Sequence, residues 1–451
     1  MNALSIAGNT VPMRLTVIGT GYLGATHAAC MAELGHEVLG VDVDPDKVAA
    51  LQAGRVPFHE PGLPELIAKH TASGRLRFTT DYAAAGAFGE VHFVCVGTPQ
   101  RSGSEGADLT YVDAAFAAIA EHAAEGALLV GKSTVPVGTA ERLAALHEAA
   151  EVAWNPEFLR EGFAVEDTLR PDRLVFGVRS SHAETILRAV YAPVLDAGTP
   201  LVTADFPTAE LVKTAANAFL ATKISFINAM AEVCEAAGGD VGVLAEAIGH
   251  DDRIGRKFLR AGIGFGGGCL PKDIRAFAHR AGELGVSLDF LREVDAINMR
   301  RRDKVVDVAR ELCGGSVLGA RIAVLGAAFK PDSDDIRDSP ALNVAARLRL
   351  DGGDVTVYDP EALDNARKAF PLLGYAVSAE EALRGADLVL HLTEWPQFRE
   401  IDPEHAAGLV SRPLIVDGRG VLDADRWTAA GWHFRALGRP APAGERSLRG
   451  L

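Results

Sequence analysis

One of the five cysteines in the chain follows a dense run of glycines. Cys269 ends the stretch GIGFGGGC, in which five of the seven residues before the thiol are glycine. Glycine lets a backbone fold closely around a ligand, and a thiol becomes a nucleophile where a positive charge or a helix N-terminus favours the thiolate. Lys272 could supply that charge, and Asp273 could orient a partner. The alternative is that Cys269 is a small buried apolar residue, but the glycines favour a functional role.

Two polar residues stand four positions apart in an apolar stretch upstream of this cysteine. Lys213 and Asn217 would share one face of a helix. The apolar surroundings predict that this face points inward or into a cleft, where the pair could polarise or anchor a substrate oxygen. The alternative is a lysine whose stem is buried and whose ammonium reaches solvent.

Glu157 and Glu161 repeat the four-residue spacing in the stretch NPEFLREG. Two carboxylates on one helical face repel each other unless a ligand or a cation lies between them. One of the two could therefore act as a general base through a water molecule. The alternative is a pair of solvated acids at the start of a helix.

A second glycine pattern lies near the N-terminus. Gly19, Gly21 and Gly24 form G-x-G-x-x-G between the strand-like run RLTVIG and the helical run ATHAACMAELG. That order predicts a dinucleotide site with the pyrophosphate at a helix N-terminus. Asp42 ends the next strand-like run, where a carboxylate binds ribose hydroxyls and repels a 2′-phosphate, so NAD is favoured over NADP. The alternative is an ordinary glycine turn.

The elements that must position these residues can be predicted from the pattern of the chain. Short apolar runs at 36–44, 90–99 and 126–136 are typical of buried strands, and Ala-rich helical stretches separate them. This alternation predicts a parallel sheet with helices on both faces. Residues 205–237 predict one long helix, because no glycine or proline follows Pro207 in them. Strands and helices alternate again from Ala320 onward.

The expected fold class is therefore α/β, with two doubly wound Rossmann-like domains joined by a central helical domain that contains the long helix. The expected domain boundaries are 13–204, 205–312 and 313–451. The chain of 451 residues is long enough for two or three domains of ordinary size.

The composition narrows the possible partners and the location. Sixty acidic residues against 45 basic ones give a net charge of −15, which argues against nucleic acid or an anionic membrane as a partner. No apolar run reaches the roughly 18–20 residues of a membrane-spanning helix, and the N-terminal stretch lacks the pattern of a signal peptide. The scattered cysteines indicate free thiols, no metal site and a cytoplasmic location.

Taken together, the motifs resemble those of the UDP-glucose/GDP-mannose dehydrogenase family. The matching stretches extend over nearly the whole chain and are GTGYLG, VDVD, CVGTP, KSTVPVGT, NPEFLREG, ELVKTAANAFLATKISFIN, RIGRKFLRAGIGFGGGCLPKD, LGAAFKPDSDDIRDSP and VDGR. The resemblance implies an NAD-binding domain at 13–204, a dimer-forming helical domain at 205–312 and a UDP-sugar-binding domain at 313–451. It also implies oxidation of a sugar C6 alcohol to a carboxylate with two NAD⁺.

The same resemblance assigns catalytic roles to residues already singled out. Cys269 would be the nucleophile that carries a thiohemiacetal and then a thioester. Lys213 and Asn217 would stabilise the oxygen at C6. Glu157 would activate the hydrolytic water, and Thr134 would help to place that water.

Binding roles follow from the resemblance as well, and Asp273 would support proton transfer near the thiol. The implied NAD contacts are Gly19, Gly21, Tyr22, Leu23, Gly24, Asp42, Lys47, Thr98, Ser133, Thr134, Glu161, Lys272 and Arg337. The implied substrate contacts are Glu157, Phe158, Leu159, Lys213, Asn217, Arg253, Phe258, Leu259, Arg260, Phe265, Gly266, Phe329, Lys330 and Arg419.

The expected substrate is UDP-glucose, and GDP-mannose is the alternative within the family. The LPKD sequence after the glycines disfavours an N-acetylhexosamine substrate. A single-step β-hydroxyacid dehydrogenase would lack both the cysteine stretch and the third domain, and a non-catalytic NAD-binding regulator would not need Cys269 or Lys213. Arg253 matches an arginine that reaches a neighbouring subunit, so a homodimer or larger assembly is expected. One departure from the family is Gly268, where a serine is frequent.

Overall fold

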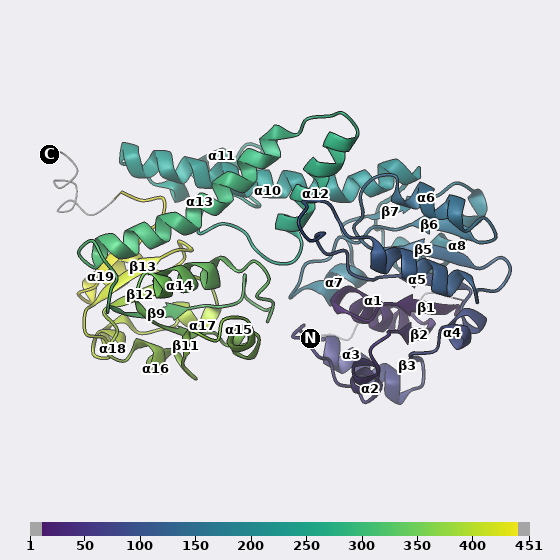
Figure 1. Ribbon diagram of the computed structural model, residues 1–451, viewed down its shortest axis with the longest axis horizontal. Coiled ribbons are helices and arrows are strands. Elements are labelled where there is room, and N and C mark those ends of the chain that lie inside the picture. Colours follow the sequence, from purple (N-terminus) through teal and green to yellow (C-terminus); the bar gives the residue numbers. More distant parts are fainter. Residues whose placement is uncertain (1–10, 441–451) are drawn as a thin grey trace. The chain divides into compact units, whose positions relative to one another are not determined.

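The computed structural model describes residues 11–440 and divides them into two compact units (Figure 1). The first unit contains the residues up to Ala216 together with His279–Val286, and the second contains Asn217–Ala278 and the residues from Ser287 onward. Residues 441–451 of the expected third domain lie outside the described residues.

A sheet of eight strands forms the centre of the first unit, in the order β3-β2-β1-β4-β5-β6-β7-β8. The strands are β1 (Arg14–Ile18), β2 (Glu37–Val41), β3 (Leu76–Thr79), β4 (Val91–Val94), β5 (Leu128–Gly131), β6 (Glu151–Trp154), β7 (Leu174–Gly177) and β8 (Leu201–Ala204). The strands from β3 to β6 in this order are all parallel and have the arrangement of a dinucleotide-binding domain.

One strand pair departs from the predicted parallel sheet. Strands β6 and β7 pair antiparallel through Trp154 and Gly177, so the expectation of a wholly parallel sheet is wrong at this position. The connection between them contains only the short helix α7 (Ala164–Leu169). A parallel pair needs a full crossover, usually an α-helix that spans the length of the sheet, and α7 is too short for that.

Helices cover both faces of this sheet, and a separate buried cluster lies under each layer. Leu15 and Val17 belong to one cluster, whereas Ile18 and Val94 belong to the other. The near-continuous apolar runs of the strands follow from this two-sided burial. The helices are α1 (Tyr22–Glu33), α2 (Pro45–Gln52), α3 (Leu63–Ala72), α4 (Tyr82–Phe88), α5 (Thr110–Ala120), α6 (Thr139–Leu146), α8 (Ser181–Val190) and α9 (Ala192–Asp196).

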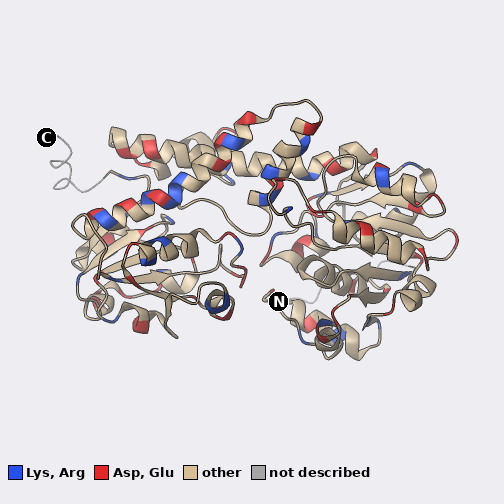
Figure 2. Ribbon diagram, viewed as in Figure 1, with Lys and Arg blue, Asp and Glu red and all other residues tan. Residues whose placement is uncertain are grey.

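The long helix predicted from the sequence is present as α10 (Phe206–Ala237), with 32 residues. Three further helices follow, α11 (Val241–Gly249), α12 (Leu270–Glu283) and α13 (Asp289–Leu312). Ala218 and Ala221 of α10 pack with Ile274 of α12 and Leu291 of α13 in one buried cluster. Acidic and basic residues are interspersed along α13 (Figure 2).

The second sheet has six strands in the order β11-β10-β9-β12-β13-β14, and every neighbouring pair is parallel. When the strands of each sheet are numbered along the chain, this order is the same as that of the strands from β3 to β6 in the first sheet. The match confirms the predicted pair of Rossmann-like folds. The strands are β9 (Arg321–Leu325), β10 (Asp354–Tyr358), β11 (Gly374–Tyr375), β12 (Leu388–His391), β13 (Leu414–Asp417) and β14 (His433–Ala436).

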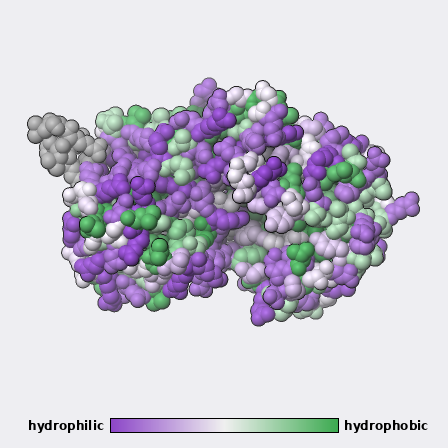
Figure 3. All heavy atoms as spheres, in the orientation of Figure 1, coloured by the Kyte–Doolittle hydropathy of each residue, from purple (hydrophilic) through white to green (hydrophobic). Residues whose placement is uncertain are grey.

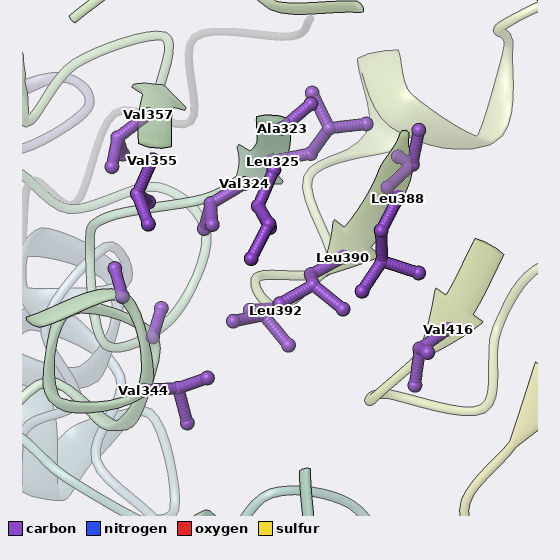
Figure 4. Close-up of a cluster of buried hydrophobic side chains, with 14 of the residues drawn as sticks. Ala323, Val324, Leu325, Val344, Val355, Val357, Leu388, Leu390, Leu392 and Val416 are labelled. Carbon is purple, nitrogen blue, oxygen red and sulfur yellow. The ribbon is translucent and has the colours of Figure 1, made fainter. Parts of the chain in front are cut away.

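The core of the second sheet is formed by branched aliphatic side chains. Val324, Val355 and Leu390 project from three neighbouring strands toward Val344 of α14 (Figure 4). The helices around this sheet are α14 (Pro340–Leu350), α15 (Leu363–Ala369), α16 (Ala379–Leu383), α17 (Pro396–Arg399), α18 (Pro403–Ala407) and α19 (Ala424–Ala429).

Asp359 follows β10 at the position that Asp42 occupies after β2. Its side chain is fully buried. One carboxylate oxygen accepts hydrogen bonds from the backbone N–H groups of Ala327 and Ala328 and from the indole of Trp395, at 2.7, 3.0 and 3.1 Å. The other oxygen accepts from the backbone N–H groups of Glu361 and Ala362, at 3.0 and 2.9 Å. These hydrogen bonds hold the turn after β9 against the end of β10.

The surface is of mixed character, and hydrophobic residues are scattered among hydrophilic ones on the face shown in Figure 3. Within residues 11–440, none of the helices has both the length and the apolar character that crossing a bilayer requires. The apolar length of α10 is interrupted by charged residues such as Lys213 and Lys223.

Candidate active site

The glycine turn after β1 has the geometry of a pyrophosphate site. Gly19 adopts a positive φ of 85°, and a Cβ on Gly24 would lie 1.8 Å from the carbonyl oxygen of Gly19, so only glycine fits. Helix α1 begins at Tyr22 with Gly21 as its N-cap. Because glycine offers no capping side chain, the first N–H groups of α1 can bind an anion. This turn fits the dinucleotide predicted from the sequence.

Asp42 lies at the end of β2 and is almost fully buried. It accepts hydrogen bonds from the N–H and hydroxyl of Thr20 at 2.8 and 2.9 Å and from Lys47 Nζ at 3.0 Å. Burial raises the pKa of Asp42, but hydrogen bonds from Asp44, Thr20 and Lys47 outweigh burial and leave the pKa below its usual value. The carboxylate is therefore ionised, and a ribose hydroxyl would share its oxygens with these donors.

Tyr22 links the glycine turn to the segment that follows β6. Its hydroxyl donates to the buried carboxylate of Glu60, which also accepts from the N–H groups of Gly162 and Ala164, each at 2.7 Å. Burial raises the pKa of Tyr22, and the neighbouring Glu60 carboxylate raises it further. Tyr22 is thus held as a neutral hydrogen-bond donor. Leu23, the next residue of the motif, packs against the sheet.

The loops after β4 and β5 bring three more predicted residues to the same edge of the sheet. Thr98 donates its hydroxyl to the backbone carbonyl of Thr134 at 2.8 Å. Ser133 donates to the carbonyl of Val96 at 2.6 Å. These bonds tie the two loops together at the carboxyl ends of parallel strands, where ligands bind in α/β sheets.

Glu157 and Lys213 meet in a shielded ion pair. Lys213 Nζ donates to Glu157 Oε1 at 3.3 Å, and the two side chains are only 7% and 12% exposed. The ammonium also lies over the ring of Phe158, 5.6 Å from its centroid, and Arg173 lies over the same ring. The inward orientation predicted for Lys213 is confirmed, and the alternative of a solvent-reaching lysine is wrong. Asn217, one turn further along α10, is also buried.

The segment that carries Glu157, Leu159 and Glu161 is a loop rather than a helix. The interpretation of the two glutamates as neighbours on a helical face, or as solvated acids at a helix start, is therefore wrong. Pro156 disfavours helical geometry in Asn155 before it, and the next helix, α7, begins only at Ala164. Glu161 is 9% exposed, so both carboxylates are shielded from solvent.

In the second unit, Cys269 stands directly before the first residue of α12. The thiol is exposed, so the alternative of a buried structural cysteine is wrong. The N–H of Asp273 donates to the carbonyl of Cys269 at 2.9 Å, which fixes the cysteine at the positive end of the helix. The positive end of a helix favours a negative charge. Lys272 Nζ contacts Asp273 Oδ1 at 2.5 Å, and Asn217 Nδ2 donates to Asp273 Oδ2 at 2.7 Å.

The residues Gly262–Cys269, which we call the cysteine loop, are held by side chains that sequence reasoning missed. Asn298 on α13 pairs with both backbone groups of Phe265, accepting from its N–H at 2.7 Å and donating to its carbonyl at 2.9 Å. Arg302 donates to the same carbonyl at 3.2 Å and to Asp338 Oδ1 at 2.6 Å. The signal in the sequence is that Asn298 and Arg302 stand in helical step with the apolar residues of this helix.

The glycines of the cysteine loop are required by close packing. Gly264 has a φ of 94°, and a Cβ on it would lie 2.4 Å from Asn298 Oδ1. A Cβ on Gly268 would lie 2.2 Å from the guanidinium carbon of Arg337. The guanidinium of Arg337, which is paired with Asp335, would have to shift to admit a side chain at this position.

The remaining predicted substrate contacts lie at several places in the second unit. Phe329 and Lys330 follow β9, and Arg419 follows β13. Arg419 donates to the carbonyl oxygens of Leu392, Gly264 and Phe329 at 2.7, 3.3 and 3.1 Å. Arg419 thus joins the cysteine loop to the turn after β9. The residues already described, Phe265 and Gly266, are buried in that loop.

Four of the predicted substrate contacts lie in the segment of the chain between α11 and the cysteine loop, and their side chains differ in exposure. Arg253 is 89% exposed and pairs with Asp251. Phe258 is partly exposed with a φ of 62°, and Arg260 is exposed. Leu259 packs into a buried cluster with Ile227 of α10, so its side chain serves the core.

The other four cysteines form no disulfide. Cys30, Cys95 and Cys234 are buried, and Cys313 is partly buried. Within the part of the chain that the structure describes, no group of three or more His, Cys, Asp or Glu side chains could hold a metal ion.

Three family models match consecutive parts of the chain. The NAD binding domain of the UDP-glucose/GDP-mannose dehydrogenase family matches residues 13–195, its central domain matches 207–300 and its UDP binding domain matches 323–424. The glycine turn and Asp42 fall in the first, Lys213 and Cys269 in the second, and Arg419 in the third. The chain therefore carries the NAD binding domain of this family.

Individual relatives extend this match to nearly the full length. The UDP-glucose 6-dehydrogenase of Rhizobium meliloti is 43% identical over 95% of this chain and 100% of that protein. The UDP-glucose 6-dehydrogenase TuaD of Bacillus subtilis is 40% identical over 96% of this chain and 94% of that protein. A solved UDP-glucose dehydrogenase from Pyrobaculum islandicum superposes with a TM-score of 0.87 at 37% identity and covers 96% of this chain and 99% of that one. The chain belongs to the UDP-glucose/GDP-mannose dehydrogenase family.

Proposed function

We propose that the chain is an NAD-dependent oxidoreductase that converts UDP-glucose to UDP-glucuronate by oxidising C6 twice. The observation that carries the proposal is the full-length similarity to UDP-glucose 6-dehydrogenases at 40–43% identity, combined with an exposed Cys269 at the start of α12. Bound NAD⁺ supplies the acceptor for one hydride in each of the two oxidations.

Cys269 holds the substrate between the two oxidations. Its sulfur forms a bond to C6 of the aldehyde, and the thiol proton passes to the carbonyl oxygen, which gives a thiohemiacetal. Loss of a hydride and a proton from that adduct leaves a thioester on Cys269. Covalent attachment keeps the half-oxidised sugar in position for the second step.

Lys213 and Asn217 hold the oxygen on C6, and Glu157 completes the reaction. The ammonium and the amide stabilise the negative charge that develops on this oxygen. Glu157 takes a proton from a water molecule, the water oxygen bonds to C6, the C–S bond breaks and the thiol recovers a proton. This chemistry requires the thiol, the ammonium and the carboxylate to act on the same carbon. Asp273 supports proton transfer at the thiol, and Thr134 helps to place the water.

The experiment that tests the function is a substrate panel with product stoichiometry. Purified protein is given NAD⁺ with UDP-glucose, GDP-mannose or UDP-N-acetylmannosamine, and NADH is counted per sugar consumed. We expect two NADH per UDP-glucose and far slower turnover of the other two sugars. Faster turnover of GDP-mannose would reassign the substrate, and one NADH per sugar would contradict the thioester route.

We also propose that the chain functions as a homodimer or a larger homo-oligomer through α10. Phe219, Phe226 and Val233 are 66%, 48% and 56% exposed and recur every seven residues. Thr222 and Ala229 stand between them, so the stripe has the alternating four- and three-residue spacing of a helix that packs against a second helix. Large exposed aromatic residues on one helical face are typical of an interface.

Sedimentation velocity of a Phe226→Glu variant tests this interface. A carboxylate in the middle of the stripe should shift the protein to monomer, because its desolvation opposes association. The matched control is Val243→Glu on α11, where Val243 is 66% exposed but lies off the stripe. A Phe226→Glu protein that sediments like the unmodified one would exclude α10 as the interface.

Two further assignments belong to the proposal. The domain boundaries are 13–204, 205–312 and 313–451, supported by the end of β8 at Ala204 and the start of α10 at Phe206. The location is cytoplasmic, supported by five cysteines that form no disulfide. Limited proteolysis that cuts first within α10 would contradict the boundary at 204.

A further inference from the structure

Lys132 is a buried lysine to which the proposed chemistry gives no task. It follows β5 and is 7% exposed. Its Nζ donates to the side-chain and backbone oxygens of Asn155 at 3.0 and 3.5 Å and to the hydroxyl of Tyr191 at 3.4 Å. The Tyr191 hydroxyl in turn donates to Asn155 Oδ1 at 2.6 Å. The three side chains therefore form one closed hydrogen-bonded network.

This network fixes the start of the loop that carries Glu157. Asn155 follows β6 and is 1% exposed. Its N–H donates to the carbonyl of Gly131 at 2.8 Å, and its amide donates to the carbonyl of Val175 at 3.0 Å. With Lys132 on its acceptors, every polar group of the Asn155 side chain is engaged. Glu157 lies only two residues further on, so the network constrains the position of the backbone that carries it.

A buried ammonium is costly where all its hydrogen-bond partners are neutral oxygens. Burial lowers the pKa of Lys132 to about 8. Cys95 and Glu157 oppose that shift, whereas Lys213 reinforces it. Glu157 and Lys213 form the ion pair of the candidate active site.

The other titratable groups around Lys132 do not explain its charge. Cys95 after β4 is buried and its pKa is raised to about 12 by burial, so it is a neutral thiol. His27 on α1 is fully buried, and burial together with the Lys132 charge lowers its pKa, so it is a neutral imidazole. Burial raises the pKa of Tyr191, which keeps its hydroxyl protonated.

We infer that Lys132 is a positioning residue for the hydrolytic step: through its hydrogen bonds to Asn155 it holds the start of the loop that carries Glu157. The inference rests on the proposed function, because it assumes that Glu157 takes a proton from the attacking water. Lys132 exchanges no proton with the substrate.

The decisive variant is Lys132→Met, which keeps the length of the side chain and removes the charge. We expect both NADH-forming steps to proceed as a rapid burst of two NADH per site. Steady-state turnover should then fall at least tenfold, and intact-protein mass should show a sugar-nucleotide adduct. A lysine with only a structural role would not slow one step selectively, because a damaged fold would lower the burst and the steady state together.

Two further variants keep the test decisive if Lys132→Met does not fold. Asn155→Asp is isosteric but sets a carboxylate against the carbonyl of Val175, so it should slow hydrolysis and keep the burst of two NADH. Lys132→Arg retains a donor for Asn155 and should recover part of the hydrolysis rate. An unchanged hydrolysis rate in both Lys132→Met and Asn155→Asp, or in Asn155→Asp alone if the former is unfolded, overturns the inference.

The failure of this inference can be told apart from the failure of the proposed function. If the unmodified protein releases two NADH per UDP-glucose and the variants hydrolyse the thioester at its rate, Lys132 is a structural lysine and the function stands. If the unmodified protein releases no NADH from UDP-glucose, the function itself is overturned and the inference with it.

Discussion

The side-chain amide of Asn217 donates a 2.7 Å hydrogen bond to Oδ2 of Asp273, which connects α10 to the first turn of α12. The second oxygen of Asp273 contacts Lys272, and the carboxylate is 3% exposed. Since the N–H of Asp273 also binds the carbonyl of Cys269, the carboxylate, the amide and the thiol are held in fixed order around one helix N-terminus.

Replacing Asp273 by Asn should therefore impair chemistry more than folding. The substitution removes the negative charge that Lys272 contacts and sets an amide against the amide of Asn217. We expect kcat with UDP-glucose to fall roughly 10²-fold, a typical loss for a displaced acid–base group, with a small change in thermal unfolding. Asp289→Asn at the exposed first turn of α13 is the control and should leave kcat unchanged.

Replacing Cys269 by Ser should convert the thioester intermediate to an oxygen ester. An ester is less reactive toward water, so we expect hydrolysis to slow by orders of magnitude and intact mass to reveal a covalent adduct. Cys269→Ala should form no adduct and should not deliver two NADH per sugar. Near-normal stoichiometry in Cys269→Ala would eliminate the covalent route. Cys313→Ser, at a cysteine remote from the loop in sequence, should behave like the unmodified protein.

NAD⁺ should be preferred over NADP⁺, because the ionised Asp42 would repel a 2′-phosphate. Asp42→Ala should narrow this preference by about tenfold or more, equivalent to about 1.4 kcal/mol. The change also releases Lys47 from its 3.0 Å pair to attract the phosphate. The measurement is kcat/KM with each cofactor, and Asp46→Ala in the first turn of α2 is the control. Equal efficiency of the unmodified protein with both cofactors would refute the assignment of Asp42.

Glu210 should make stability depend on pH near neutrality. Burial raises the pKa of Glu210 from 4.5 to about 7, although the N–H groups of Ala140 and Gly138 bind its oxygens. The folded state therefore holds a proton that the unfolded state has released between these two pH values. Stability consequently falls as pH rises from about 4.5 to about 7 and levels off above that. Glu210→Gln should remove this fall, measured by urea unfolding across the range.

Asn298 should matter more for the cysteine loop than for the rest of the fold. Asn298→Ala leaves the N–H and carbonyl of Phe265 with fewer partners in a buried place, which costs about 1–3 kcal/mol of unfolding free energy. We also expect alkylation of Cys269 by iodoacetamide to change in rate, because the loop loses its fixed geometry. Asn365→Ala, which removes an amide bound to Asp334 in the other half of the second unit, is the control. An unchanged alkylation rate would show that Asn298 does not govern the thiol.

The architecture could be predicted because local sequence patterns indicate it. Buried strands appear as apolar runs, the glycine turn has a fixed spacing, and α10 contains no glycine or proline after Pro207. The reversal at β7 could not be predicted, since strand direction depends on how the chain packs after β6 rather than on any residue type. The helical interpretation of Glu157 and Glu161 failed because a four-residue spacing indicates a shared face only where a helix exists.

The hydrogen-bond networks around the candidate site could not be predicted from the spacing of residues in the sequence alone. Lys132 and Asn155 stand in motifs that could be singled out, yet their contact joins the ends of two different strands. Asn298 lies on a helix more than thirty residues after Phe265, and nothing in the local sequence connects them. Such pairs become visible only when the fold brings distant segments together.

The shared strand order of the two sheets has a consequence for engineering. Asp42 and Asp359 occupy matching places after the second strand of each sheet, yet five N–H groups of the chain consume the oxygens of Asp359. A carboxylate has about four lone-pair positions, so none is left for a bound nucleotide. Cofactor specificity can thus be redesigned at Asp42. Asp359 instead holds the second sheet together, and its replacement would destabilise the fold.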